Sequence, residues 1–223
     1  MIKKLIVPAF LLFTLISFAQ QGTSSPYSFY GIGDVKFKGT SENRSMGGLS
    51  IFSDSIHLNI QNPASYTSLK LTTFSLGGTY TTTKLKTNSQ NENARRTTMD
   101  YLAVGLPLGK FGVAFGLMPY SSVGYNIESR IAATTTPVAT PEQIKKFTGN
   151  GGLNKVFAGT GYEITPNLSI GLDFSYNFGK IETYSLRFVE GLQYGSREKN
   201  LSDISGVSFT AGLNYKTKIN CKS

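Results

Sequence analysis

The 223-residue chain contains no tryptophan, one cysteine and one histidine. Cys221 has no partner for an internal disulfide, so a disulfide scaffold is excluded. His57 and Cys221 lie far apart in the sequence and do not make a zinc site, and any catalytic nucleophile and base would have to be arranged around His57. We therefore expect no enzymatic activity, no catalytic residue, no metal and no cofactor. We interpret His57 as a structural or solvated residue.

Charged residues and long apolar runs are also scarce. Only 16% of the residues are charged, whereas about 25% is typical of soluble domains. After residue 18 no apolar stretch is long enough to cross a membrane as a helix. The mean hydropathy of −0.11 fits a soluble protein and a membrane β-barrel equally, because barrels mix lipid-facing apolar residues with lumen-facing polar ones.

Gly31-Ile32-Gly33 lacks the third glycine and the preceding strand of a dinucleotide-binding loop.

The N-terminus has the three parts of a secretory signal peptide. Lys3 and Lys4 are followed by an apolar run, and Ser17 and Ala19 supply small residues at the cleavage site. We expect residues 1–19 to be removed and the mature chain to begin at Gln20. A membrane anchor is the alternative, but the run is shorter than the roughly 20 residues that a spanning helix needs. No cysteine follows the cleavage site, which disfavours a lipoprotein.

The net charge of +9 is compatible with two interpretations. A basic surplus on an exported protein favours contact with anionic lipopolysaccharide, or it reflects solvated loop lysines. Export argues against a nucleic-acid partner.

The strongest positive signal is an alternation of apolar and polar residues. In Leu168–Phe178 every even position is apolar or aromatic and every odd position is small or polar. Side chains along a strand point alternately to the two faces of the sheet, so one face could meet lipid and the other a watery lumen. Asp173 and Asn177 lie on the polar face of this strand, and we expect both to face the lumen.

Similar segments recur after residue 70, separated by short turns and long polar loops. Residues 20–69 show no sustained period, and we expect a compact hatch or plug there. We expect tight turns at 107–110 and 165–167, a single helical turn within 142–147, and long loops at 88–96 and 127–152. The pattern is unclear in 179–204, where we expect a third long loop in which 183–194 is either a further strand or an extended loop element. Short turns on one side and long loops on the other are typical of an outer-membrane barrel. The fold prediction is therefore all-β, a transmembrane antiparallel β-barrel over residues 70–223. A soluble β-sandwich is the alternative.

The predicted barrel looks incomplete. We count six or seven strands, fewer than the roughly 8 of the smallest single-chain barrels, and no final strand ends in an aromatic residue. We expect a truncated chain, because an unclosed sheet in lipid leaves costly unpaired backbone groups.

Five short motifs stand out along the chain: Met46-Gly47-Gly48 with Asp54, Asn62-Pro63-Ala64, Gly151-Gly152-Leu153-Asn154, Gly159-Thr160-Gly161-Tyr162 and Leu168-Ser169-Ile170-Gly171. In this order they resemble FadL/TodX-type transporters and the related PorV-like proteins of Bacteroidota. The resemblance implies a barrel with an N-terminal hatch in its lumen and passive passage of hydrophobic molecules such as fatty acids. It places Asn62, Pro63 and Ala64 in the hatch, although these residues also fit a plain turn before a strand.

The resulting hypothesis is a FadL-like protein of the cell outer membrane. Its expected partners are outer-membrane lipid, lipopolysaccharide, a hydrophobic small-molecule ligand and the barrel assembly machinery. A PorV-like component that docks exported proteins and a secreted β-sandwich that binds glycans are the alternatives.

Overall fold

A computed structural model describes residues 23–86, 91–133 and 141–217. The expected signal peptide, residues 1–19, and Cys221 lie outside these residues. The elements, in chain order, are η1 (Pro26–Phe29), β1 (Asp34–Val35), α2 (Ser41–Ser45), η2 (Pro63–Ser68), β2 (Thr73–Lys86), β3 (Asn91–Leu108), β4 (Phe111–Ile131), β5 (Gln143–Thr165), β6 (Leu168–Val189) and β7 (Ser196–Tyr215).

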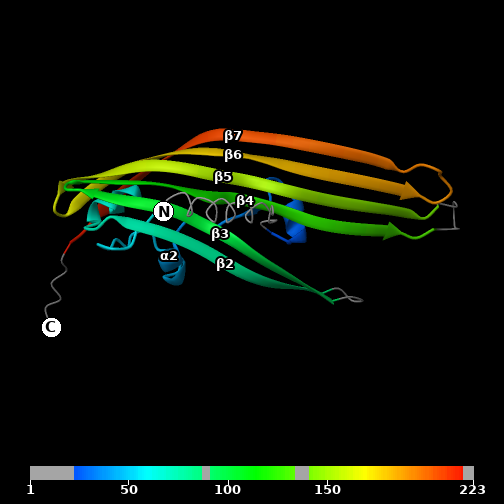
Figure 1. The fold of residues 1–223 in the computed structure, drawn as a ribbon, viewed down its shortest axis with the longest axis horizontal. Coiled ribbons are helices and arrows are strands. Elements are labelled where there is room, and N and C mark those ends of the chain that lie inside the picture. The colour runs from blue at the N-terminus through cyan, green and yellow to red at the C-terminus, as the bar shows by residue number, and fades with distance from the viewer. Residues whose placement is uncertain (1–22, 87–90, 134–140, 218–223) are drawn as a thin grey trace, which may run out of the picture.

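The strands form one antiparallel sheet in the order β2-β3-β4-β5-β6-β7, with the short β1 paired to β4. The all-β, antiparallel prediction is confirmed. The sheet is not closed into a barrel, since no ladder joins β2 to β7 in the part of the chain that the structure describes, and this agrees with the expectation of an incomplete barrel. The strands lie in a single curved layer (Figure 1), so the alternative of two packed sheets is wrong.

The short turns lie where the sequence predicted them. Leu108 pairs with Phe111 across Gly109-Lys110, and Gly109 has φ 69°. This left-handed conformation is one that glycine adopts without a steric penalty. Thr165 pairs with Leu168 across the second turn, Pro166-Asn167.

The predicted long loops are much shorter than expected. β4 continues to Ile131 and β5 begins at Gln143, where the two residues pair, so the helical turn predicted for 142–147 is wrong. β6 and β7 likewise extend from both sides into residues 179–204, and strand β3 begins at Asn91. A second apolar cluster holds these extensions from the inner side: Ile181 is buried against Val123 and Tyr125, and Ile127, Phe147 and Ile204 pack beside them. These apolar residues are separated by many polar residues and glycines, so the composition looked like that of a loop.

The sheet has two different faces. Its inner face packs against residues 23–72, which we call the N-terminal segment, and its outer face points away (Figure 1). On β6 the inner positions Ser169, Asp173 and Ser175 are buried, whereas the outer positions, such as Leu172 and Phe174, are exposed. The usual arrangement of a soluble sheet, apolar inside and polar outside, is thus reversed on this strand.

Local capping explains the helices of the N-terminal segment. The Thr40 side chain accepts a hydrogen bond from the backbone of Asn43 at the start of α2. Asn62 accepts one from the backbone of Ala64 at the start of η2, whose first residue is Pro63. Both arrangements satisfy backbone donors that a helix start leaves free. The main core cluster joins this segment to the sheet and consists of Leu58, Ile60, Tyr66, Leu69, Tyr101, Ala103, Ala114, Met118 and Phe157.

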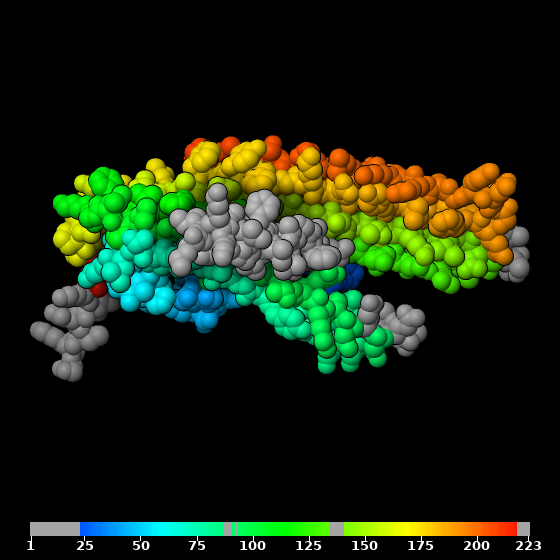
Figure 2. Space-filling model, in the orientation of Figure 1, coloured from blue at the N-terminus to red at the C-terminus, as the bar shows by residue number. Residues whose placement is uncertain are grey.

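The sheet is continuous at the end that carries the short turns and divided at the other end. β3 pairs with β4 only from Leu102 to Leu108. Beyond that point β2 and β3 continue together as an arm that separates from β4 (Figure 1), and the space-filling view shows this arm as a distinct lobe (Figure 2). No helix in the described residues combines the length and apolar character that a membrane crossing requires.

Candidate functional site

The inner face carries a row of glycines beneath η2. Gly112, Gly161, Gly171 and Gly212 lie on four neighbouring strands and are directly opposite one another in the ladders. A Cβ atom would come within 2.1 Å of the Tyr66 carbonyl oxygen at Gly112 and within 2.4 Å of the Pro63 carbonyl carbon at Gly171. We call these four residues the glycine row. It lets the backbone of η2 lie directly on the sheet.

Asn62, Pro63 and Ala64 lie where the N-terminal segment crosses this row. The Asn62 side-chain amide donates to the carbonyl oxygen of Leu213 on β7 at 3.2 Å. Pro63 and Ala64 form the first turn of η2 and are buried. Serine 169 on β6 donates from its hydroxyl to the Ala64 carbonyl at 3.1 Å. The segment is therefore fastened to the sheet by backbone and side-chain contacts on two strands.

Asp173 forms the polar centre of the inner face. The Tyr66 hydroxyl lies 3.1 Å from both carboxylate oxygens of Asp173 and donates to them. Burial, followed by the neighbouring carboxylate, raises the pKa of Tyr66 well above its ordinary value. The hydroxyl therefore keeps its proton and remains a donor. Tyr66 and Asp173 are 107 residues apart in the sequence, and their contact joins the N-terminal segment to β6.

Asn177 lies on the same strand but contacts a different partner. Its amide donates to the Ser208 hydroxyl on β7 at 3.2 Å. The alternation correctly indicated that Asp173 and Asn177 share a face, but the two residues do not form one site. Sequence reasoning missed Tyr66, because nothing local marks a tyrosine in an aperiodic segment as the partner of a carboxylate on a distant strand.

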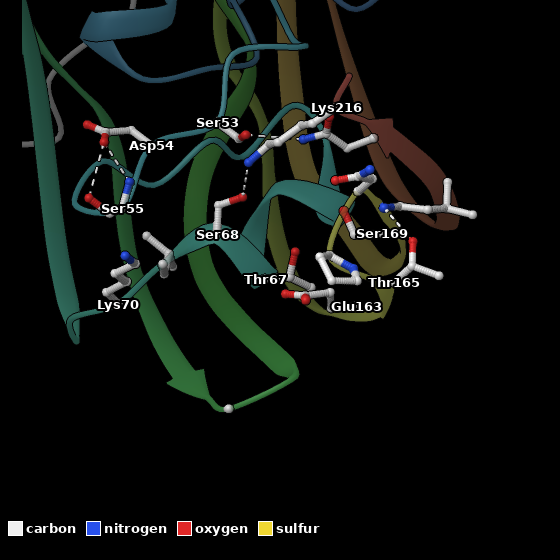
Figure 3. Close-up of a pocket in the computed structure, with 16 residues that line it drawn as sticks. Ser53, Asp54, Ser55, Thr67, Ser68, Lys70, Glu163, Thr165, Ser169 and Lys216 are labelled. Atoms are coloured by element: carbon white, nitrogen blue, oxygen red, sulfur yellow. Dashed lines mark hydrogen bonds between the residues drawn. The ribbon is translucent and has the colours of Figure 1, made fainter. Parts of the chain in front are cut away.

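A polar pocket opens at the end of the sheet that carries the short turns (Figure 3). It has a volume of about 420 Å³ and is lined by the N-terminal segment and by the turn residues. Lys216 donates to the Ser68 hydroxyl at 3.0 Å, and Asn214 donates to the Ser53 hydroxyl at 3.2 Å. Lys70 and Glu163 also line it, so the pocket presents charges of both signs. Its chemistry suits polar contacts with another macromolecule.

The pocket rim holds no catalytic arrangement. Asp54 accepts from the Ser55 hydroxyl at 3.4 Å and contacts the His57 ring at 2.5 Å. The serine thus contacts the carboxylate and not the imidazole, whereas an activated nucleophile needs a hydrogen bond to its base. The described residues contain no group of three or more histidine, cysteine or acidic side chains that could hold a metal ion.

The outer face carries a continuous apolar surface, which we call the outer band. On β6 it runs from Ile170 to Phe178, about 27 Å at 3.3 Å per residue. No charged residue occupies an outer position of this stretch. The exposed residues of the band are Phe74, Leu76 and Tyr80 on β2; Leu108, Phe111 and Phe115 on β3 and β4; Val156 and Tyr162 on β5; Ile170, Leu172, Phe174, Tyr176 and Phe178 on β6; and Val207, Phe209, Leu213 and Tyr215 on β7.

These features define an all-β protein with a single antiparallel sheet, an apolar outer face and an inner face filled by its own N-terminal segment. The chain belongs to the BamG family, whose model matches residues 1–223. No curated protein and no solved structure matches the chain. The family name connects the protein with the barrel assembly machinery and with the outer membrane.

The family match overturns the resemblance to FadL/TodX-type transporters and the transport function inferred from it. The physical reason lies in the motifs themselves. Asn-Pro-Ala indicates the start of a helix, Gly-Gly indicates a place where two backbones approach closely, and alternation indicates a strand with one apolar and one polar face. Such features are properties of a sheet packed on an irregular segment, and they do not distinguish one family with this architecture from another.

Proposed function

We propose that this protein is a membrane-embedded component of the outer-membrane barrel assembly machinery. In this proposal the outer band meets lipid, the short turns face the periplasm, and the polar pocket between them contacts other subunits. The observation that carries the proposal is the exposed outer band: large apolar residues are exposed along the outer face, and on β6 the inner positions opposite to them are buried and polar.

The dimensions of the outer band support contact with a bilayer. A membrane-spanning strand needs about 9–11 residues, and the lipid-facing surface of a barrel is about 25 Å tall. The span from Ile170 to Phe178 fits both values. Aromatic residues lie at both margins, with Phe111 and Tyr162 in contact at one end and Tyr176 stacked on Phe178 at the other. Outer-membrane barrels carry aromatic girdles at these two levels.

The filled inner face supports a role in assembly over a role as a conduit. η2 lies directly on the glycine row, and Tyr66 binds Asp173 across the inner surface. A path along this face would require the breaking of these contacts. The N-terminal segment also presents part of the polar pocket, so it extends the surface that the short turns offer to partners.

Two matched variants test the membrane contact. Leu172 and Leu201 are both exposed outer-face leucines, at 63% and 55%, but only Leu172 lies in the outer band. We expect Leu172→Lys to lower recovery of the protein in the outer-membrane fraction, since a lysine at the middle of the lipid face costs about 2–4 kcal/mol. Leu201→Lys should leave recovery unchanged. Equal recovery of both variants would show that the outer band does not contact lipid.

The link to assembly is tested with a tagged full chain purified in mild detergent from outer membranes. We expect the central barrel subunit of the machinery to co-purify, and we expect depletion of this protein to reduce the amounts of folded outer-membrane β-barrel proteins. Normal barrel levels after depletion, together with no co-purified barrel subunit, would contradict the proposed function.

A further inference from the structure

The sheet continues beyond the outer band on the side opposite the short turns. β4 to β7 stay paired there (Figure 1), and the ladder of β6 with β7 runs on from Phe178 to Arg187, about 30 Å at 3.3 Å per residue. The inner face of this stretch is occupied by the apolar cluster around Ile181, so its outer face is the one that a ligand can reach. In the proposed orientation, with the outer band in lipid and the short turns in the periplasm, this stretch stands above the outer surface of the membrane.

The chemistry of the outer face changes directly above Phe178. Lys180 and Tyr184 are in phase with the exposed residues of the outer band on β6, and Lys199 lies opposite Tyr184 on β7. Arg197 follows on the same face of β7, opposite the next outer position of β6. We call Lys180, Tyr184, Arg197 and Lys199 the cationic column.

Two cations of the column share one aromatic ring. The guanidinium carbon of Arg197 lies 5.4 Å from the centroid of the Tyr184 ring, and Nζ of Lys199 lies 5.2 Å from it. A cation near the face of an aromatic ring is attracted by the ring quadrupole, so the ring holds both side chains in one place. Lys199 also forms an ion pair with Glu182 at 3.7 Å. Two cations thus lie beside one carboxylate, and the local charge is positive.

Lys180 lies lower in the column, next to the aromatic margin of the outer band. Its ammonium group is 3.2 Å from the Asp203 carboxylate, and the two side chains are 66% and 65% exposed. Exposed ion pairs are weak because water and salt screen them, so a phosphate group can displace this carboxylate. Asn150 and Asn154 line a hollow of about 650 Å³ beside the pair, and side-chain amides both donate to and accept from hydroxyl groups.

The spacing of the column indicates the kind of lipid that it fits. Lys180 is about 7 Å above Phe178 and Tyr184 is about 20 Å above it, at 3.3 Å per residue. A phospholipid carries its anionic group at a single level, directly above its acyl chains. Lipopolysaccharide carries phosphates on lipid A at that level and further acidic groups on the core sugars above it. Cations at both levels, with amides beside the lower one, fit lipopolysaccharide.

We propose that the cationic column binds lipopolysaccharide, with a lipid A phosphate at Lys180 and an acidic group of the inner core at Arg197 and Lys199. The acyl chains then lie on the outer band around Phe174 and Phe209, whose rings contact each other. The orientation of the ligand rests on the proposed function, whereas the recognition of its anionic groups rests on the column alone.

A tryptophan reporter tests this proposal, because the chain contains no tryptophan. Leu201→Trp places the reporter on β7 between Lys199 and Asp203, at a side chain that is 55% exposed. The full chain in mild detergent is titrated with purified rough lipopolysaccharide, with the same lipopolysaccharide after removal of its phosphates, and with phosphatidylglycerol. We expect a saturable fluorescence change with the intact lipid and at least about tenfold weaker binding of the other two. The absence of saturable binding, or comparable binding of either control lipid, would overturn the proposal.

Two variant pairs, each lacking two positive charges, separate the column from the overall charge of the protein. Arg197→Gln with Lys199→Gln alters the column, and Lys84→Gln with Lys110→Gln alters exposed lysines on the arm and at a short turn. We expect the first pair to weaken binding of lipopolysaccharide at least about tenfold and the second to change it less than about twofold. Equal losses would show that net charge alone attracts the lipid, and the column would not be a site.

The pair Arg197→Lys with Lys199→Arg keeps both charges and tests for a merely structural role. It should bind lipopolysaccharide within about threefold of the parent, and all variants should share the urea midpoint of the parent. A loss as large as in the glutamine pair would show that positive charge is not what the lipid recognises. Co-purification of the machinery without binding of lipopolysaccharide would overturn this inference and leave the proposed function intact, and binding without co-purification would do the reverse.

Discussion

The two ends of this sheet pack against the N-terminal segment in different ways. At the end with the short turns, β4 to β7 form uninterrupted ladders over the glycine row, and η2 lies flat on their inner face. At the other end, β4 to β7 remain paired, but β3 leaves β4, and among the described residues the short strand β1 pairs with β4 in its place. The two ends therefore differ in the pairing of β3 with β4 and in what lies on the inner face.

The two ends also differ in how the N-terminal segment is attached to the sheet. Both ends carry exposed side chains, and each has a buried polar link that joins the two layers. The Tyr66 hydroxyl donates to Asp173 in the first region, and the Gly124 N–H donates to the Ser28 hydroxyl in the second. The arm formed by β2 and β3 is held at its base by Ser41 and Arg44. We expect the packing of η2 on the glycine row to make the first region the larger contributor to the stability of the fold.

The largest expected effect comes from filling the glycine row. In Gly171→Val the new side chain meets the Pro63 carbonyl carbon, which lies 2.4 Å from the Cβ position. Because well-packed interiors tolerate added volume poorly, we expect a loss of about 1–3 kcal/mol in the free energy of unfolding. Urea unfolding in detergent measures the loss, and proteolysis reports release of the N-terminal segment.

Gly206→Val is the matched control for this prediction. Gly206 lies on β7 with nothing within 4 Å of its Cβ position, and its backbone does not have a positive φ. Valine favours strands, so this variant should be as stable as the parent. A similar loss in both variants would mean that the glycine row does not determine the docking of η2.

A smaller effect is expected from removal of the buried polar link. Tyr66→Phe deletes the donor to Asp173 and leaves a buried carboxylate with one partner fewer, at a cost of about 1 kcal/mol, the net contribution of one hydrogen bond. Tyr215→Phe, at a side chain that is 63% exposed, is the control and should change the urea midpoint little. If Tyr66→Phe unfolds at the same urea concentration as Tyr215→Phe, the link does not fasten the N-terminal segment.

The sequence revealed the first region better than the second. Alternation in Leu168–Phe178 correctly identified the two faces of β6, and the two short turns were correctly located. The extensions around Ile131 and Gln143 were missed because their few apolar residues, such as Ile127 and Phe147, are too widely spaced to show a sustained alternation. The separation of β3 from β4 was missed for another reason: it is accompanied by contacts such as that of Ser41 with Tyr101, which connect residues far apart in the chain.

The candidate site shows the same limit. The polar face of β6 predicted an inward Asp173, but its partner Tyr66 lies in a segment without periodicity. The four glycines of the row are unremarkable one at a time, and their function appears only when the strand register places them side by side. Register depends on pairing across strands, which a single sequence does not display.

A local effect is expected in β4 when its pairing with β1 is weakened. Lys36→Pro removes the N–H that donates to the Tyr120 carbonyl, and Lys36→Ala keeps it. One such hydrogen bond contributes about 1 kcal/mol, so amide exchange in residues 120–124 should rise roughly fivefold in the proline variant alone, since 1.4 kcal/mol corresponds to a factor of ten. Equal exchange in the two variants would show that β1 does not hold this part of β4.

The smallest effect is expected at an exposed pair on the rim of the polar pocket. The His57 ring hydrogen-bonds to Asp54, and this contact, followed by the Ser55 N–H, lowers the pKa of the Asp54 carboxyl below its ordinary value of 3.8. A lowered pKa in the folded state means that the contact stabilises the fold above the ordinary pKa and stops doing so as the pH falls through the folded value. Carboxyl NMR titration should place Asp54 below 3.8 in the parent and closer to 3.8 in His57→Ala. Both side chains are partly exposed, so the urea midpoint at neutral pH should stay within error of the parent; a clear drop would show that this pair braces the N-terminal segment as Tyr66 does.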